Sequence, residues 1–216
     1  MGLNHTIQLY NYPAVQGMCD LINKNVWVDC IITEFRRKYF NEETIKEDLA
    51  CVADHMSAIL SSEGTVYIKV NLEDIPLVLE IFVNHCFRLK NLLTIKIPVE
   101  HLICKTNKYI DCGVNYVLFF GRADHNSSYF NVTKYSPDKT CHYTSDWSWF
   151  TGETMIEAYR VMMAINTKHA DTILDPFMYL GDVGVAAIQQ DRHFIGIEEN
   201  RICFDYAKKR LDELGE

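Results

Sequence analysis

One group of side chains with the types and spacing for chemistry follows the apolar run Val28–Thr33. The next four residues are Glu34, Phe35, Arg36 and Arg37. An acid and two guanidinium groups at the end of a buried strand can accept a hydrogen bond, hold an anion or pair with one another. For the arginines, contact with DNA phosphate or an acidic partner weighs about equally with an ordinary solvated surface.

A second group lies in the segment ILDPFMYLGDVGVAAIQQDRHFIGIEEN. A strand is predicted to end at Asp175, a loop with Gly181 leads into a helix from Asp182, and the next strand delivers Glu198 about 20 residues on. The helix N-terminus offers unpaired N–H groups, and an acid at a strand end can accept both hydroxyls of a ribose. This predicts a nucleotide-type site. The alternatives are a capping or loop-bracing role for Asp175 and a surface position for Glu198.

Hydrophobic periodicity predicts the elements that position both groups. Because strands alternate with helices, we expect a doubly wound α/β fold with a mostly parallel sheet and helices on both faces. The expected strands end at Ile32 or span Thr65–Val70, Arg88–Pro98, Tyr116–Phe120, Thr172–Leu174 and Phe194–Ile197; the expected helices run from Asn41 to a stop at Ser61–Gly64, over Glu73–His85 and Thr154–Thr167, from Asp182, and through Arg210.

Composition sets the class of protein. The 216 residues are 48% hydrophobic and 23% charged, which suits a single globular domain over residues 1–216. Neither a membrane span nor a signal sequence is recognisable, so we expect a cytoplasmic protein, or a nuclear one in a eukaryote, with no membrane partner. The net charge of -8 argues against broad electrostatic adhesion to nucleic acid, although local basic patches remain open.

The eight cysteines are scattered and form no CxxC pair, which predicts free thiols rather than a disulfide scaffold. The eight histidines do not pair with cysteines or acids at metal-ligand spacing. We therefore expect no metal site.

Several blocks in a fixed order resemble one enzyme family. They are IQLYN, VDCIIT, NLLTIKIP, NYVLFFGR, SYFN, DPFMYLG with GIEE, and AKKRL. On these blocks the chain resembles the permuted, β-class DNA amino-methyltransferases, which use S-adenosylmethionine (SAM) to methylate adenine N6 or cytosine N4. The resemblance implies a Rossmann-like SAM methyltransferase fold, with a remnant of the catalytic half in residues 1–120. It also implies a short aromatic excursion in residues 121–150, in place of the target-recognition region, and a cofactor half in residues 151–216.

The catalytic motif of that family is (D/N/S)PP(Y/F/W), which holds the amine of a flipped base and stacks on its ring. Here Glu34, Phe35, Arg36 and Arg37 stand at these four positions. Both prolines are lost, and the arginines bring donors where the amine already supplies donors. The resemblance therefore predicts a degenerate catalytic site.

The cofactor motif is kept in part. The resemblance assigns SAM contacts to Asp175, Phe177, Gly181 and Glu198, but the bulky segment Met178–Leu180 replaces small residues and argues against SAM binding.

Two other positions bear on activity. The family's H-P-x-x-K-P pattern is replaced by Trp149–Thr154, and Tyr39 or Phe40 could supply the missing stacking ring if the loop were remodelled.

We therefore expect a catalytically inactive, methyltransferase-like binding subunit that contacts DNA or a partner through Arg36 and Arg37. By the resemblance it would form a homodimer or a heterodimer with a methyltransferase subunit. One alternative is an active adenine N6 or cytosine N4 DNA methyltransferase with an atypical catalytic loop. A second alternative is a regulator that senses SAM or a related nucleoside through Glu198.

Overall fold

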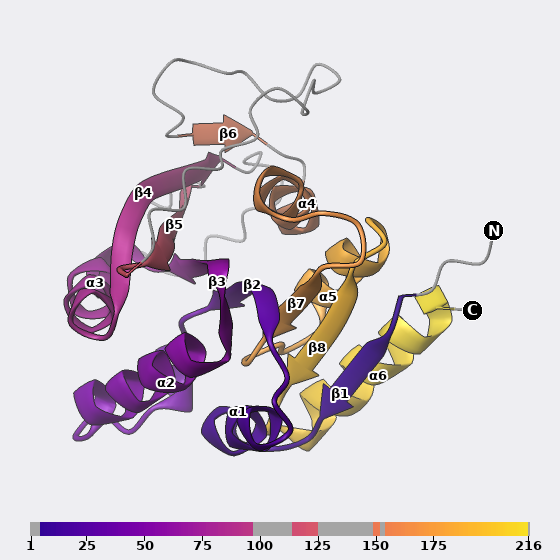
Figure 1. Ribbon diagram of the computed structural model, residues 1–216, viewed down its shortest axis with the longest axis horizontal. Helices are drawn as coiled ribbons and strands as arrows, with labels where there is room; N and C mark the ends of the chain where they lie inside the picture. Colours follow the sequence, from indigo (N-terminus) through magenta and orange to yellow (C-terminus); the bar gives the residue numbers. More distant parts are fainter. Residues whose placement is uncertain (1–4, 97–113, 125–148, 152–153, 216) are drawn as a thin grey trace, which may run out of the picture.

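The computed structural model describes residues 5–96, 114–124, 149–151 and 154–215 (Figure 1). Within them, eight strands form one sheet in the order β1-β8-β7-β2-β3-β5-β4-β6. The strands are β1 (Ile7–Tyr10), β2 (Val28–Glu34), β3 (Leu60–Val70), β4 (Phe87–Lys96), β5 (Val114–Arg122), β6 (Trp149–Thr151), β7 (Thr172–Asp175) and β8 (His193–Ile197); the helices are α1 (Ala14–Asn23), α2 (Ile45–Ile59), α3 (Ile75–Asn84), α4 (Met155–Asn166), α5 (Asp182–Ile188) and α6 (Arg201–Gly215), with short 3-10 helices η1 (Arg37–Tyr39) and η2 (Leu72–Asp74).

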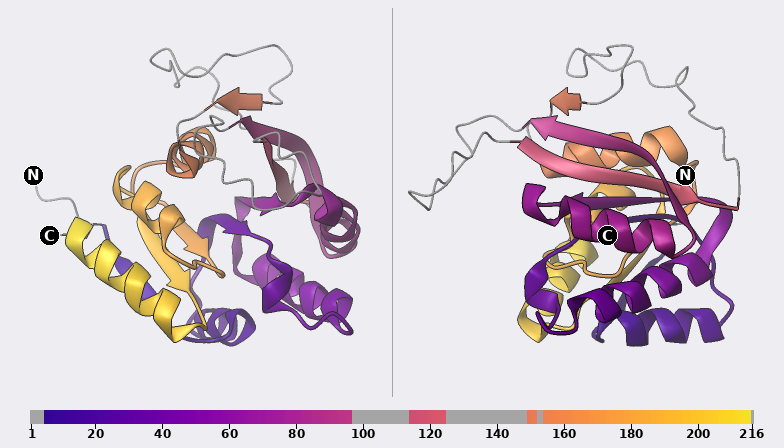
Figure 2. Two further views of the ribbon diagram at one scale, coloured as in Figure 1. Left: turned by 180° about the vertical axis from the view of Figure 1, so that it is seen from behind. Right: turned by 90° about the vertical axis from the view of Figure 1, so that its left-hand side faces the viewer.

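Most of the sheet is parallel. Strands β1, β8, β7, β2 and β3 run in one direction, β5 is antiparallel to both β3 and β4, and β6 is parallel to β4. The long strands β4 and β5 form the antiparallel end of the sheet, as the right-hand view of Figure 2 shows. The predicted doubly wound α/β fold with a mostly parallel sheet is confirmed.

Helices cover both faces of the sheet. Helices α1, α2 and α3 lie on one face and α4, α5 and α6 on the other (Figure 1), because each set buries an apolar side against the strands. In α2, large apolar residues recur every three or four positions, and each of them is buried: Ile45, Leu49, Val52, Met56 and Ile59. In α4, the Thr154 side chain and Glu157 form a capping box that starts the helix.

The structure differs from the predicted elements at several places, among them β6, which places a strand at the end of the predicted excursion. Periodicity did not predict β1, a four-residue strand, or α1, which follows Pro13 and carries Gly17 in its middle. Strand β3 begins at Leu60 rather than Thr65, since the serine-rich segment after α2 continues the strand with a register shift opposite Val28 and Cys30. Short elements and shifted registers are decided by pairing with distant strands.

Of the predicted aromatic excursion at residues 121–150, residues 125–148 lie outside the described residues, as do Ile97 and Pro98 of the predicted strand. In the part of the chain that the structure describes, no helix is both long and apolar enough to cross a membrane.

Candidate functional site

The two groups predicted from the sequence meet at one edge of the sheet. Strand β2 ends at Glu34, β7 ends at Asp175, and Glu198 follows β8 directly. Since β8, β7 and β2 are parallel neighbours, their carboxyl ends lie side by side. Sites in open α/β sheets form at this edge.

The Glu198 side chain is a buried acid rather than a surface one, with 1% of its area exposed. Its Oε2 accepts hydrogen bonds from the Tyr39 hydroxyl at 3.0 Å and from the Tyr179 backbone N–H at 3.0 Å. Its Oε1 accepts from the Asn200 backbone N–H at 2.8 Å. Both oxygens are thus engaged by groups of this chain.

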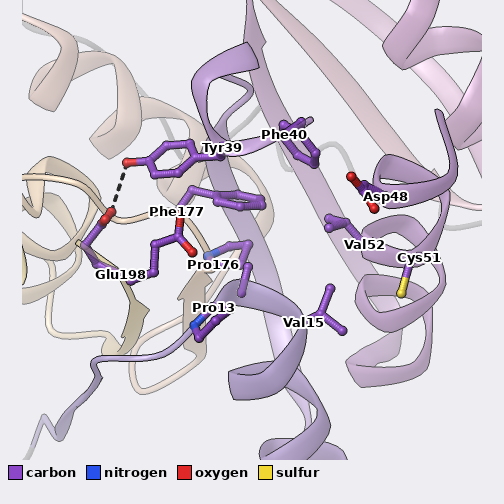
Figure 3. Close-up of a pocket in the computed structure, with 12 residues that line it drawn as sticks. Pro13, Val15, Tyr39, Phe40, Asp48, Cys51, Val52, Pro176, Phe177 and Glu198 are labelled. Atoms are coloured by element: carbon purple, nitrogen blue, oxygen red, sulfur yellow. Dashed lines mark hydrogen bonds between the residues drawn. The ribbon is translucent and has the colours of Figure 1, made fainter. Parts of the chain in front are cut away.

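Tyr39 reaches Glu198 because η1 turns the chain back over the sheet edge after β2 (Figure 3). Its ring packs on Phe177 with centroids 5.3 Å apart. Burial and the neighbouring Glu198 carboxylate raise the pKa of Tyr39, so its hydroxyl stays a proton donor. Tyr39 therefore holds the acid that the sequence assigned to ribose hydroxyls. Sequence reasoning considered Tyr39 only as a ring for a base, because no spacing rule links it to an acid 159 positions away.

A cavity of about 320 Å³ adjoins this contact. Tyr39, Phe177 and Glu198 form one side of it, and residues from the start of α1 and from α2 form the other (Figure 3). The volume lies at the lower end of the range for small-molecule pockets.

Glu34 is held between two cations. Its Oε2 accepts from Arg36 Nη2 at 2.6 Å and its Oε1 from Lys69 Nζ at 3.2 Å. Burial opposes ionisation of Glu34, but Lys69 and Arg36 outweigh it and lower the pKa of the carboxyl. The Arg36 guanidinium also lies over the Tyr179 ring, 4.1 Å from its centroid. The motif's polar acceptor position is thus filled by an internal ion pair.

Arg37 turns toward η2. Its Nε donates to Asp74 Oδ1 at 2.6 Å, and its Nη1 donates to Glu42 Oε2 at 3.1 Å. The Asp74 carboxylate is fully buried. Both predicted contact arginines therefore have carboxylate partners within the chain, and Lys38 is the exposed cation next to them.

Phe35 belongs to the core rather than to a binding surface. Its side chain is 4% exposed and packs against Phe40, with ring centroids 5.3 Å apart. Its backbone N–H donates to the Lys69 carbonyl at 2.8 Å, which extends the pairing of β2 with β3. The position that holds a proline in the family motif is here a strand-like hydrogen-bond donor.

Asp175 braces the loop that follows β7. Its Oδ1 accepts from the Thr33 hydroxyl at 2.7 Å and from the Phe177 N–H at 3.1 Å. Burial raises the pKa of Asp175 to about 7; the two hydrogen bonds oppose this, and the charges of Glu34 and Glu198 add to it.

The loop ends at Gly181, where φ is +82°. A Cβ at this position would lie 3.3 Å from the Ala207 Cβ of α6, so both the backbone angle and the close packing favour glycine. Arg210 of α6 fastens the same turn by donating to the Leu180 carbonyl and to Asp182.

The bulky side chains of the loop lie in different environments. Met178 is buried in the core at 2% exposure, and the Tyr179 ring lies under the Arg36 guanidinium. Where the resemblance places the SAM ribose, three internal donors already hold the Glu198 oxygens. The observed side-chain arrangement therefore does not fit SAM unless Tyr39 moves away. Among the residues that the structure describes, no three potential ligands are grouped to hold a metal ion.

Comparisons with known proteins agree with this architecture. Over 206 residues, 89% of this chain and 72% of the relative, the sequence is 23% identical to the type II methyltransferase M2.MboI of Moraxella bovis. Over 55 residues, which is 26% of this chain but only 18% of the relative, it is 44% identical to the type II methyltransferase M.Cfr9I of Citrobacter freundii.

Among solved structures, the crystal structure of the M1.HpyAVI–SAM complex has a TM-score of 0.73 at 21% identity, and the match covers 96% of this chain and 100% of that one. This confirms the expected methyltransferase-like fold. Residues 25–209 match the DNA methylase family (N6_N4_Mtase). Since that match takes in most of the chain, from β2 to the last turns of α6, the protein belongs to the DNA methylase family.

Proposed function

We propose that this member of the DNA methylase family does not transfer methyl groups and acts as a binding subunit. The observation that carries the proposal is the hydrogen bond from the Tyr39 hydroxyl to the Glu198 carboxylate. A residue from the former catalytic loop takes the position on the acid that the cofactor's ribose would use. The chain thus closes its own cofactor site with its own catalytic loop.

The state of Glu34 supports the same conclusion. An amine is positioned for methyl transfer when an oxygen atom accepts its N–H groups and so aims the nitrogen lone pair at the methyl donor. Here both Glu34 oxygens accept from cations, and Arg36 and Lys69 offer only donors. An amine that arrived at this edge would meet donors rather than a ready acceptor.

A protein partner fits the charges better than DNA alone. Arg36 and Arg37 are paired with Glu34 and Asp74, and the chain carries a net charge of -8. DNA affinity depends largely on cations that neutralise phosphates. We therefore favour a homodimer or a heterodimer with an intact methyltransferase chain, in which that chain supplies catalysis and the main DNA contacts.

Two other functions follow if Tyr39 leaves Glu198. An active adenine N6 or cytosine N4 methyltransferase would need SAM to displace Tyr39 and the loop to rebuild an amine acceptor. A SAM or nucleoside sensor would need only the first of these steps, and the cavity beside Glu198 favours it over the enzyme.

Calorimetric titration with SAM tests these functions. We expect no heat of binding with the wild-type chain, and no transfer of labelled methyl groups from SAM to duplex DNA. Binding without transfer would instead support the sensor, and binding with transfer would support the enzyme; either result would overturn the proposal.

Tyr39→Phe tests the observation that carries the proposal, because it removes the hydroxyl from Glu198 and keeps the ring on Phe177. We expect any residual SAM binding to be tighter in this variant than in the wild type. Tyr206→Phe is the matched control, since Tyr206 is 57% exposed on α6. Equal SAM affinities in the wild type and both variants, at measurable levels, would show that Tyr39 does not close the site.

Co-purification tests the binding role. We expect the tagged chain to elute from size-exclusion chromatography as a dimer, either with itself or with an intact methyltransferase chain from its own source. A chain that elutes as a monomer both alone and together with the methyltransferase chain would count against the subunit role.

A further inference from the structure

Helices α1 and α2 bring two cysteines and a histidine together. Cys19 Sγ of α1 lies 3.0 Å from His55 Nε2 of α2. Cys51 Sγ, one turn before His55, lies 3.7 Å from His55 Nδ1. Sequence spacing did not predict this cluster, because Cys19 precedes His55 by 36 positions.

The backbone fixes which nitrogen of His55 carries the proton. Nδ1 lies 2.7 Å from the carbonyl oxygen of Cys51, so this nitrogen donates its hydrogen to the carbonyl. Nε2 then presents a lone pair, and the Cys19 S–H is its donor. The Cys19 thiol, the His55 base and the Cys51 carbonyl that orients this base are therefore linked by hydrogen bonds in that order, as an activated thiol requires.

The other described thiols lack this arrangement. Burial raises the pKa of Cys30 to about 12, which keeps it protonated in the core. Burial, followed by the charge of Asp54, raises the pKa of Cys51. Cys86 is exposed on the surface and serves as a reference for an accessible thiol.

We propose that Cys19 is a modification site, a thiol that His55 activates for reaction with hydroperoxides. The Cys19 proton moves to His55 Nε2 and the sulfur attacks the nearer peroxide oxygen. An S–O bond forms as the O–O bond breaks, and the departing hydroxide or alkoxide takes the proton from His55. The sulfur is oxidised by two electrons to sulfenic acid, and the peroxide is reduced to water or an alcohol.

Cys19 lies on α1, one of the two helices that contribute residues to the cavity. Pro13, Ala14 and Val15 at the start of α1 line the cavity, as do Cys51 and Val52 of α2. Oxidation of Cys19 removes its S–H donor and adds an oxygen between the two helices. The proposal does not depend on whether the protein binds SAM or transfers methyl groups.

Alkylation of the full chain with iodoacetamide, followed by peptide mass spectrometry, tests the reactivity. At pH 7 we expect Cys19 to react about tenfold faster than Cys86, although Cys19 is half-buried and Cys86 exposed. His55→Gln is expected to reduce the Cys19 rate to that of Cys86 or below. Cys51→Ser is the matched control and leaves the Cys19 rate within about twofold, because the Cys51 carbonyl that orients His55 remains.

A pH profile separates activation from a change in packing. The charged groups on the two helices are Asp20 on α1 and Lys46, Glu47, Asp48 and Asp54 on α2, and the His85 ring lies 2.7 Å from Asp54. We expect His55→Gln to slow the alkylation of Cys19 across the pH range while circular dichroism stays unchanged, because the imidazole that accepts the thiol proton is gone.

Two results would overturn the proposal. One is a Cys19 rate at or below that of Cys86 in the wild type. The other is rapid alkylation without a sulfenic acid at Cys19, trapped with dimedone, after treatment with hydrogen peroxide.

Discussion

The carboxylate of Glu198 illustrates how a predicted position can have partners that the sequence does not predict. Its place at the end of β8 is the one that the sequence predicted, yet its hydrogen bonds come from Tyr39, Tyr179 and Asn200. The acid was predictable from the spacing after Asp175. The donor Tyr39 was not predictable, because η1 brings its side chain across the sheet edge to Glu198.

Arg37 has a structural task that can be measured. Its Nε donates to the fully buried Asp74 at 2.6 Å, and Arg37→Ala would leave that carboxylate without its charged partner. We expect a loss of about 1–3 kcal/mol in the free energy of unfolding, somewhat less than for a fully buried pair because the arginine side chain is partly exposed. Urea denaturation measures the change.

The matched control for this substitution is Arg201→Ala on α6. Arg201 pairs with Asp205 on the exposed surface, where solvent screening leaves such a pair with little effect on stability. Equal losses for the two variants would mean that Asp74 does not need Arg37.

Asp175 should make stability depend on pH. Its pKa in the folded chain is about 7, against 3.8 for an unperturbed aspartate, so the folded state retains a proton that the unfolded state releases. The free energy of unfolding therefore falls as pH rises from about 4 to about 7, by on the order of 3 kcal/mol in total.

Asp175→Asn isolates this contribution. The amide oxygen can still accept from Thr33 and Phe177, and the side chain cannot ionise. We expect the variant to exceed the wild type in stability at pH 8 and to lose this advantage near pH 4, in thermal denaturation at both pH values. A variant that is less stable than the wild type at pH 8 would show that the carboxylate is needed in its charged form.

At the scale of elements, packing against α6 fixes the turn between β7 and α5. Gly181 adopts a φ of +82° and packs against α6, while Met178 enters the core. The backbone path is thus retained by packing between α5 and α6.

Gly181→Ala should be destabilising for this reason. A side chain at positive φ, together with a Cβ contact at 3.3 Å to Ala207, is expected to cost about 1–2 kcal/mol in the free energy of unfolding. Gly215→Ala is the control, since a Cβ there has its nearest contact at an ordinary 3.4 Å and should change stability by less than about 0.5 kcal/mol. A neutral Gly181→Ala would mean that the turn tolerates another backbone conformation.

Elements with a strong period were predictable, and those held by distant pairing were not. Helices α2 and α4 matched their predicted spans to within a few residues because apolar spacing and a capping box specify them locally. Strand β1 has only four residues, and its pairing with β8 joins the two ends of the chain. No local pattern carries that information.

For the whole molecule, the net charge of -8 and the internal pairing of Arg36 and Arg37 predict weak binding to DNA by the isolated chain. We expect a dissociation constant no tighter than about 10⁻⁵ M for a short duplex near physiological salt, within the range of non-specific binding. Fluorescence anisotropy at several salt concentrations measures both affinity and salt dependence.

Lys38→Ala tests the cation that remains exposed at the site's edge. It should weaken this binding and reduce the salt slope by about one unit if Lys38 contacts phosphate. Lys208→Ala, which removes a cation already paired with Asp212, is the control. Submicromolar affinity with a steep salt slope would contradict the preference for a protein partner.

The sequence by itself determined the fold class and the strand ends that carry Glu34, Asp175 and Glu198, because local periodicity and ordered motifs encode them. Only the tertiary structure decided what these groups bind. Glu34 accepts hydrogen bonds from Lys69 and Arg36, and Glu198 accepts one from Tyr39. Such bonds form between residues that folding of the chain brings together, often over long sequence separations. Spacing along the chain specifies which side chains reach an edge, whereas three-dimensional packing specifies which of them are already satisfied there.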